Sequence, residues 1–310
     1  MEQIDDIKTF KMNFHKNYHE FLLPNLTLFE KQRKWQLIKA ILWTIILLCA
    51  SVAYFWLIIK FEIRGKHTGD PGIILLALGL SQYWIHKKSF EGKLKDKFIK
   101  SICKCFGNIE YKNYYSDDEL RRFSNVGLFS EFTTSTTDDA FAGSYKDVNI
   151  EIIESEFERG SGRNSTTVFK GLLIKLDMNK NFKGHTLLME DKLFHKSPLP
   201  NLKHTELEDI KFEKRFDVFT DDEIEARYIL TPTFMERLTA IRTAFKCKNV
   251  RCAFYQNQLF IAMSTNQDLF SLGSLIKPVA DPKQFTEFCA QFVSVLALID
   301  HLKLDTKAVL

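Results

Sequence analysis

The stretch from Arg215 to Tyr228 holds the densest set of side chains that could do chemistry. Five carboxylates fall within nine residues: Asp217, Asp221, Asp222, Glu223 and Glu225. Carboxylate oxygens are the ligands that divalent cations such as Ca²⁺ prefer in proteins. The density therefore raises the hypothesis of a membrane-bound enzyme or ligand sensor that uses Asp217, Asp222 and Glu225.

A structural interpretation of the same stretch competes with the chemical one. The spacing and the central glycine of a calcium-binding loop are missing. Arg215 and Arg227 are close enough in sequence to neutralise the acids as ion pairs. The pattern favours a buried ion-pair corner that joins a strand to a helix, and it leaves the catalytic or sensing alternative open.

Motifs of well-known chemistry are missing from the rest of the chain. The sequence contains no P-loop, dinucleotide-binding fingerprint, paired-histidine zinc helix or nucleophile elbow. Cysteine spacing favours reduced thiols over a disulfide framework. Cys247 and Cys252 have a separation usual for zinc ligands, but Cys103 and Cys105 do not, so we expect buried thiols. We predict no metal and no cofactor, and we favour a non-enzymatic role over catalysis.

The chain has a strong signature of a membrane anchor. Residues 40–59 contain no charged side chain, and twenty helical residues at about 1.5 Å each cross the roughly 30 Å hydrocarbon layer once. Tryptophan and tyrosine near both ends are typical of the membrane interface. We therefore predict a transmembrane helix and a lipid bilayer as its partner.

A second apolar run covers residues 71–85. Its fifteen residues form a helix of about 22 Å, which spans the bilayer only if the bilayer thins or if Lys87 and Lys88 extend to the headgroups. A re-entrant or interfacial segment is the alternative. We predict a two-span anchor over residues 31–88.

The orientation follows from basic residues near the ends of the two runs. The flanks before the first run and after the second carry eight of them: Lys31, Arg33, Lys34, Lys39, Lys87, Lys88, Lys93 and Lys95. The connecting loop carries three: Lys60, Arg64 and Lys66. We expect a multi-pass protein with both termini cytoplasmic.

Two helical segments flank the anchor. Apolar residues at three- and four-residue spacing predict an amphipathic helix within residues 1–30, which Pro24 should end. Phe90, Leu94 and Phe98 recur every four residues and predict a helical stalk over residues 89–106, with lysines near lipid headgroups.

Residues 107–310 form the expected soluble domain. Alternating runs predict strands at 150–157, 168–178, 185–189 and 212–219, and a hairpin at 250–255 and 258–263. Helices are expected after Thr231, with a capping box of Thr233 and Glu236, and from 281 to about 302. Consecutive strands followed by helices are typical of the α+β class with an antiparallel sheet.

The acidic stretch also resembles a known family. Its segments Glu213 to Val218 and Glu225 to Glu236, with Phe169-Lys-Gly171 and Asn181-Phe-Lys-Gly184 upstream, are similar to the bacterial domain-of-unknown-function family 3137 (DUF3137). The resemblance extends from about residue 35, although Leu172-Leu173 stands where an aromatic pair is expected. Six residues carry the family signature: Arg215, Asp217, Asp222, Glu225, Arg227 and Tyr228.

The resemblance implies a two-span protein of the bacterial cytoplasmic (inner) membrane with no assigned activity. The formal charge of +4, from 43 basic and 39 acidic residues, is too balanced for a nucleic-acid binder. We expect an interaction or scaffolding module with a membrane or membrane-associated protein partner, which includes a second copy of the chain.

Overall fold

The computed structural model describes residues 7–62, 70–103, 109–112, 114–178, 181–190, 197–207, 213–267, 269–270, 275–276, 278–279 and 282–307. The chain forms two compact units. The sheet unit contains Met1–Phe14, Cys103–Phe270 and Thr286–Leu310. The two-helix unit contains His15–Ile102 and Ser271–Phe285.

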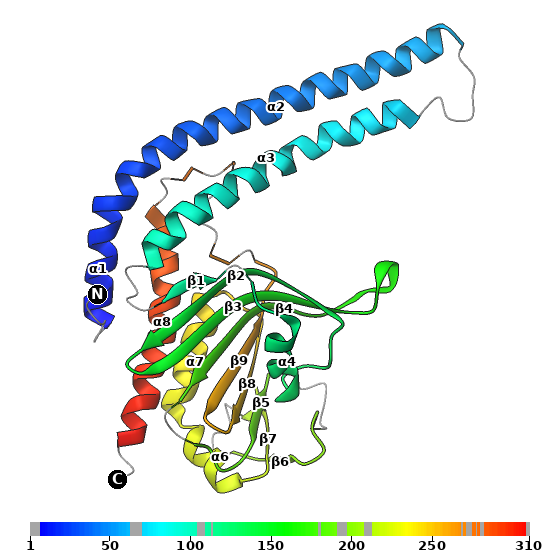
Figure 1. The fold of residues 1–310 in the computed structure, drawn as a ribbon. Coiled ribbons are helices and arrows are strands. Elements are labelled where there is room, and N and C mark those ends of the chain that lie inside the picture. The colour runs from blue at the N-terminus through cyan, green and yellow to red at the C-terminus, as the bar shows by residue number, and fades with distance from the viewer. Residues whose placement is uncertain are drawn as a thin grey trace. The chain divides into compact units, whose positions relative to one another are not determined.

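The sheet unit is built on one sheet, which has nine strands among the described residues and the order β1-β2-β3-β4-β9-β8-β5-β7-β6 (Figure 1). Every pairing between neighbouring strands is antiparallel. The strands are β1 (Glu110–Lys112), β2 (Thr134–Tyr145), β3 (Val148–Arg159), β4 (Thr166–Asp177), β5 (Thr186–Met189), β6 (Lys203–Thr205), β7 (Asp217–Thr220), β8 (Asn249–Tyr255) and β9 (Gln258–Ser264).

The mixed helix and antiparallel-sheet class predicted from the sequence is confirmed. The strands expected at 150–157, 168–178 and 185–189 are β3, β4 and β5, and the expected hairpin is β8 and β9. The strand expected at 212–219 begins later than predicted: residues 214 and 215 form a turn, and β7 starts at Asp217. Residues 211 and 212 lie outside the described residues.

Each face of the sheet is covered by helices (Figure 1). Phe260 of β9 contacts Phe123 of helix α4 (Asp117–Asn125), with ring centroids 5.3 Å apart. Phe254 of β8 contacts Phe234 of helix α7 (Pro232–Ala244), also at 5.3 Å. Residue 254 pairs with 259 in the hairpin, so Phe254 and Phe260 point to opposite faces. The sheet is therefore the middle layer of three.

Aromatic rings fill the layer under helix α8 (Pro282–Lys307). Phe141 of β2 contacts Phe270, Phe288 and Phe292 at ring-centroid distances of 4.8, 6.1 and 5.1 Å. Edge-to-face arrangements of this kind are favourable because the positive ring edge meets the negative ring face. Four phenylalanines therefore meet in this part of the core.

Helix starts in the sheet unit are capped by side chains. Ser116 and Glu119 form a reciprocal capping box on α4. Thr231 caps α7 by accepting a hydrogen bond from the Phe234 N–H at 3.2 Å. The expected capping box of Thr233 and Glu236 is wrong, because the preceding threonine already occupies the cap and Pro232 starts the helix.

The N-terminal helix differs from its prediction at Pro24. Helix α1 (Ile7–Asn17) ends before it, a π-helical turn η1 (Tyr18–Leu22) follows, and helix α2 (Leu23–Lys60) begins at once. Proline cannot donate the usual hydrogen bond and clashes with the preceding turn, and the wider π-turn gives it room. Pro24 therefore does not stop the helical winding.

The two-helix unit pairs α2 with helix α3 (Asp70–Cys103) in antiparallel directions (Figure 1). Thr44 Oγ1 donates to the Gly79 carbonyl at 3.1 Å, and Ser51 Oγ donates to the Gly72 carbonyl at 2.8 Å. A Cβ on Gly72 would lie 2.7 Å from the Phe55 ring. Small residues at seven-residue spacing let the two backbones approach closely.

Among the described helices, α2 alone is long and apolar enough to cross a membrane by itself, and 6% of its most apolar stretch is buried inside the protein. Residues 71–85 are helical within α3, as expected. They do not reach the same length and apolarity, because His86 and Lys87 follow so soon. The second span therefore stays a prediction.

Candidate functional site

The predicted signature residues lie along β7 and helix α6 (Glu223–Ile229), with Arg215 and Asp217 at the start of β7 and the other four from Asp222 onward, after its end. Asp217 is buried on β7, with its Oδ1 3.7 Å from His204 Nε2 on β6. Asp222 caps α6, because its Oδ1 accepts the Glu225 N–H at 3.0 Å. The Asp222 carboxylate therefore serves the helix start.

Glu225 fastens a neighbouring loop to α6. Its Oε1 accepts the Lys183 N–H at 3.1 Å and its Oε2 accepts the Gly184 N–H at 2.7 Å. Asp221 Oδ1 accepts the next amide, that of His185, at 2.7 Å. A Cβ on Gly184 would lie 2.7 Å from Asp221 Oδ1, so glycine is needed for this approach. The backbone N–H groups of three successive residues, 183–185, therefore donate to the carboxylates of Glu225 and Asp221.

Arg215 does not take the place that the sequence suggested. Arg215 Nε donates to Glu190 Oε1 at 2.6 Å, and Glu190 Oε2 accepts the Val250 N–H at 2.8 Å. Arg227 is exposed on α6, as is Tyr228. The expected pairing of Arg215 with the acidic stretch is wrong, because Arg215 joins Glu190 at the end of the neighbouring strand β5; the pairing expected of Arg227 stays a prediction. Both oxygens of Glu225 and one oxygen of Asp222 accept backbone amides, so a catalytic or sensing use of these residues would compete with those hydrogen bonds.

A second acidic group lies on the sheet and was missed from the sequence. Carboxylate oxygens of Asp138, Asp139 and Glu154 all lie within 4.8 Å of one another. A bulge in β2 between residues 137 and 140 brings the adjacent aspartates opposite Glu154 of β3. Asp139 accepts the Tyr111 hydroxyl at 2.8 Å, and Glu154 accepts the Leu269 N–H at 3.1 Å. The signal in the sequence was two successive acids, Asp138 and Asp139, in a segment that was not predicted to be a strand.

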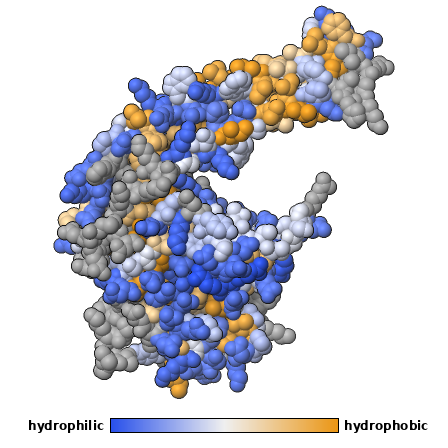
Figure 2. Space-filling model, in the orientation of Figure 1, coloured by the Kyte–Doolittle hydropathy of each residue, from blue (hydrophilic) through white to orange (hydrophobic). Residues whose placement is uncertain are grey.

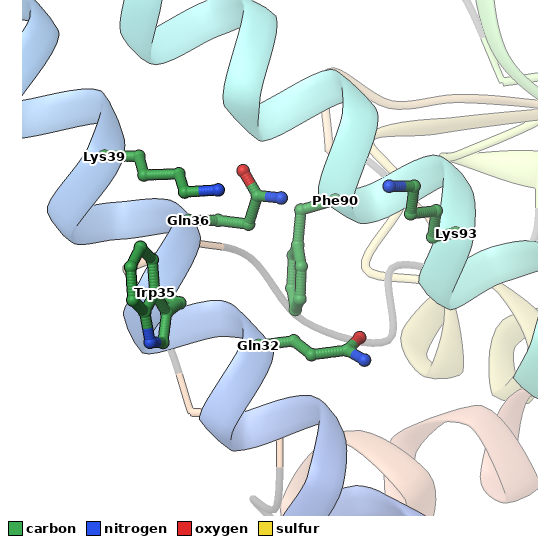
Figure 3. Close-up of a pocket in the computed structure, with 6 residues that line it drawn as sticks. All are labelled: Gln32, Trp35, Gln36, Lys39, Phe90 and Lys93. Atoms are coloured by element: carbon green, nitrogen blue, oxygen red, sulfur yellow. The ribbon is translucent and has the colours of Figure 1, made fainter.

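The two-helix unit contains a cavity of about 390 Å³ between α2 and α3 (Figure 3). Its size falls within the roughly 300–1,000 Å³ common for ligand pockets. Six residues line it: Gln32, Trp35, Gln36, Lys39, Phe90 and Lys93. The four from α2 lie at three- and four-residue spacing, so they share one face of the helix.

Polar contacts shape this cavity. Gln36 Oε1 is hydrogen-bonded to His86 Nδ1 at 2.8 Å, which ties α2 to α3 beside the cavity. The Lys39 ammonium lies 5.0 Å from the centroid of the Trp35 ring, a cation–π contact. Lys39 and Lys93 line this cavity from α2 and α3, with Gln36 and Phe90 between them in the view (Figure 3).

The ends of the apolar stretch of α2 carry matching pairs. Lys39 lies over Trp35 at one end, and Lys60 lies over Trp56 at the other, at 4.6 Å from the ring centroid. These two lysines bracket the charge-free residues 40–59. Lysine and tryptophan are the side chains enriched where a helix leaves the hydrocarbon layer.

A partly buried ion pair holds another part of the two-helix unit. Arg33 donates to both oxygens of Glu30, at 2.9 and 2.6 Å, and to the Leu275 carbonyl at 2.5 Å. Glu30 Oε2 also accepts the Val279 N–H at 3.1 Å. The hydrogen bond from Arg33 lowers the pKa of Glu30. This arrangement fastens Leu275 and Val279 to α2.

Comparison with known proteins finds a similar family for the C-terminal part of the chain. Residues 167–304 match the family model described as "Protein of unknown function (DUF3137)". The chain resembles the DUF3137 family. The matched range runs from β4 into α8 and includes the whole signature from Arg215 to Tyr228. It begins well after residue 35, so the expected resemblance of the anchor is not part of the DUF3137 match.

Other comparisons add little. No curated protein matches the chain. Among solved structures, the mycobacterial trehalose monomycolate transport factor A, TtfA, is 16% identical over 64% of this chain and 92% of its own, with a TM-score of 0.34. Values this low carry no argument about function.

Proposed function

We propose that this protein is a membrane-anchored, non-enzymatic interaction module of the bacterial inner membrane, with α2 and α3 both crossing the bilayer and both termini in the cytoplasm. The observation that carries the proposal is the uncovered apolar surface of α2. Ile41, Ile46 and Val52 expose 50%, 54% and 69% of their surface. Figure 2 shows hydrophobic side chains gathered along this part of the two-helix unit.

Water is an unfavourable surrounding for such a surface. A soluble protein rarely leaves so large a contiguous apolar patch exposed. A helix satisfies its own backbone hydrogen bonds, so lipid can replace water around it without further cost. The polar hydroxyls of Thr44 and Ser51 face glycine carbonyls of α3, which hides them from lipid.

The path of α3 supports a second crossing. Its hydrogen bonds to α2 continue from Gly79 to Gly72, alongside the charge-free stretch. Because α3 stays paired with α2 over this length, α3 should lie in the same lipid environment as α2. The shorter apolar run of α3 then needs only its flanking lysines to reach the headgroups.

Labelling of introduced cysteines in intact cells tests this topology. A membrane-impermeant maleimide should label a Glu62→Cys variant from outside, and it should label Lys31→Cys and Lys88→Cys variants only after permeabilisation. If the Lys88→Cys variant is labelled together with Glu62→Cys, α3 does not cross the membrane.

The interaction role is supported by the exposed face of α6. Ile224 is 85% exposed and Tyr228 is 46% exposed, and both lie on the same face as Arg227. Tyrosine and arginine are the residue types most often found at binding hot spots. Cross-linking in native membranes should capture a specific protein, which can be a second copy of the chain.

An Arg227→Ala variant should lose that cross-linked product, and an Arg237→Ala variant, exposed on α7, should keep it. Recovery of the same products from wild type and Arg227→Ala would refute the role of this face. Recovery of no specific product from wild type would refute the interaction proposal as a whole.

A further inference from the structure

We propose that the cavity between α2 and α3 binds the phosphate headgroup of an anionic phospholipid. This inference rests on the proposed membrane anchorage of α2. It assigns to the two-helix unit a lipid site that is separate from any protein-binding surface of the sheet unit.

The depth of the cavity matches the headgroup layer. Lys39 directly precedes the charge-free residues 40–59, and Gln32 lies seven residues earlier. Seven helical residues cover about 10 Å. The interfacial layer adds roughly 5–8 Å on each side of the hydrocarbon core. When residues 40–59 fill the core, the cavity opens among the lipid headgroups.

The lining suits a phosphate group. Lys39 from α2 and Lys93 from α3 supply two positive charges, and their side chains extend inward from the two sides of Gln36 and Phe90 (Figure 3). Gln32 and Gln36 add amide groups that can donate hydrogen bonds. None of the six lining residues is acidic. An anion held between the two lysines would gain from both charges.

Nearby carboxylates are engaged elsewhere. Glu30 is bound by Arg33 at 2.6 Å. Glu91 lies on α3 within 3.9 Å of Lys87. Neither acid lines the cavity, so neither cancels the charge of Lys39 and Lys93.

The apolar part of the lining favours a lipid over free phosphate. Phe90 is 3% exposed and forms one wall, and the Trp35 ring forms another. Below Lys39, the exposed side chains of Ile41, Leu42 and Trp43 continue the apolar surface. A molecule with a phosphate head and acyl chains can use both surfaces, whereas inorganic phosphate uses the lysines alone.

Native mass spectrometry of the full chain in neutral detergent tests the site. Phosphatidylglycerol and phosphatidylcholine are added in parallel, and the bound fraction of each is measured. Wild type should retain phosphatidylglycerol in preference to phosphatidylcholine. A Lys39→Gln/Lys93→Gln variant should bind phosphatidylglycerol roughly 30-fold more weakly, because each of the two lysines should contribute about 1 kcal/mol near an anionic lipid.

The matched control is a Lys34→Gln/Lys88→Gln variant, which also removes one exposed lysine from each helix but leaves the cavity lining intact. It should bind like wild type. A Lys39→Arg/Lys93→Arg variant keeps the charges and should retain the lipid. Retention would show that substitution at these two positions does not by itself disrupt the fold.

Equal loss in the control, or unchanged binding in Lys39→Gln/Lys93→Gln, would overturn the proposal. Displacement of phosphatidylglycerol by millimolar inorganic phosphate would assign the site to free phosphate instead. The membrane fraction is measured in the same preparations. If wild type is absent from that fraction, the anchorage fails; if it is present but shows no preference for phosphatidylglycerol, only the lipid site fails.

Discussion

Removal of the Glu225 carboxylate should loosen the loop at residues 181–185. In the structure, the two oxygens of Glu225 accept the Lys183 and Gly184 N–H groups at 3.1 and 2.7 Å. A Glu225→Ala variant leaves both donors without their acceptor. A Glu225→Gln variant keeps one carbonyl oxygen and presents an amide nitrogen to the other donor.

The magnitude follows from the two bonds. Hydrogen bonds to a charged group contribute about 1.5–3 kcal/mol each, and the bond to Lys183 is exposed and therefore weaker. Glu225→Ala should cost about 2–4 kcal/mol of local stability. Because 1.36 kcal/mol is tenfold in an equilibrium constant, exchange of the two amides should speed up by roughly one to three orders of magnitude. Glu225→Gln should show about half this free-energy change.

Hydrogen–deuterium exchange of the peptide over residues 181–190 measures this effect directly. Glu223→Ala is the matched control, because Glu223 is an exposed acid in the same first turn of α6. It should change the free energy of local opening, as measured by exchange of these amides, by no more than about 0.5 kcal/mol. The reasoning fails if Glu225→Ala and Glu223→Ala exchange alike. A large effect of calcium on wild-type exchange would favour the cation hypothesis instead.

Three further predictions concern other groups. Burial lowers the pKa of His185 below its ordinary value of 6.5, so His185 takes up a proton at higher pH in the unfolded chain than in the folded one. The free energy of unfolding should therefore fall as the pH drops through about 6.5. Urea titrations of a His185→Gln variant should lose that pH dependence. Burial raises the pKa of the Cys252 thiol well above its usual value, so iodoacetamide at pH 8 should modify half-buried Cys289 in the native chain and Cys252 only after unfolding. An Arg33→Ala variant leaves Glu30 without its buried partner and should destabilise the two-helix unit by about 3–5 kcal/mol, seen as faster proteolysis within residues 271–285.

Local patterns in the sequence predicted much of the fold. The β8 and β9 hairpin, α7 and α8 are each marked by alternation, a cap or an apolar stripe within a short window. Strand β2 was not predicted, because its segment TSTTDDAFAGSY has few apolar residues at its start. It forms a hairpin with the next strand, β3, in a register that runs from Tyr145 opposite Val148 to Thr134 opposite Glu158, so its place in the sheet follows from β3 and not from a pattern of its own.

The candidate sites were predictable only in part. The density of acids around Asp222 was visible, but their use as acceptors for the 183–185 amides was not, because it depends on β5 lying beside β7. Arg215 could not be matched to Glu190 for the same reason. Trp35 and Lys93 were expected near the membrane interface, whereas the cavity between them required the pairing of α2 with α3.

Alkaline carbonate extraction of native membranes tests the membrane anchorage most directly. Residues 40–59 contain eleven Leu, Ile, Val and Phe residues, which favour insertion by about 3–7 kcal/mol on the scale for helix insertion, with no charged residue to oppose them. The full-length chain should remain with the membrane pellet at high pH. Its appearance in the supernatant would contradict the anchorage and every proposal that depends on it.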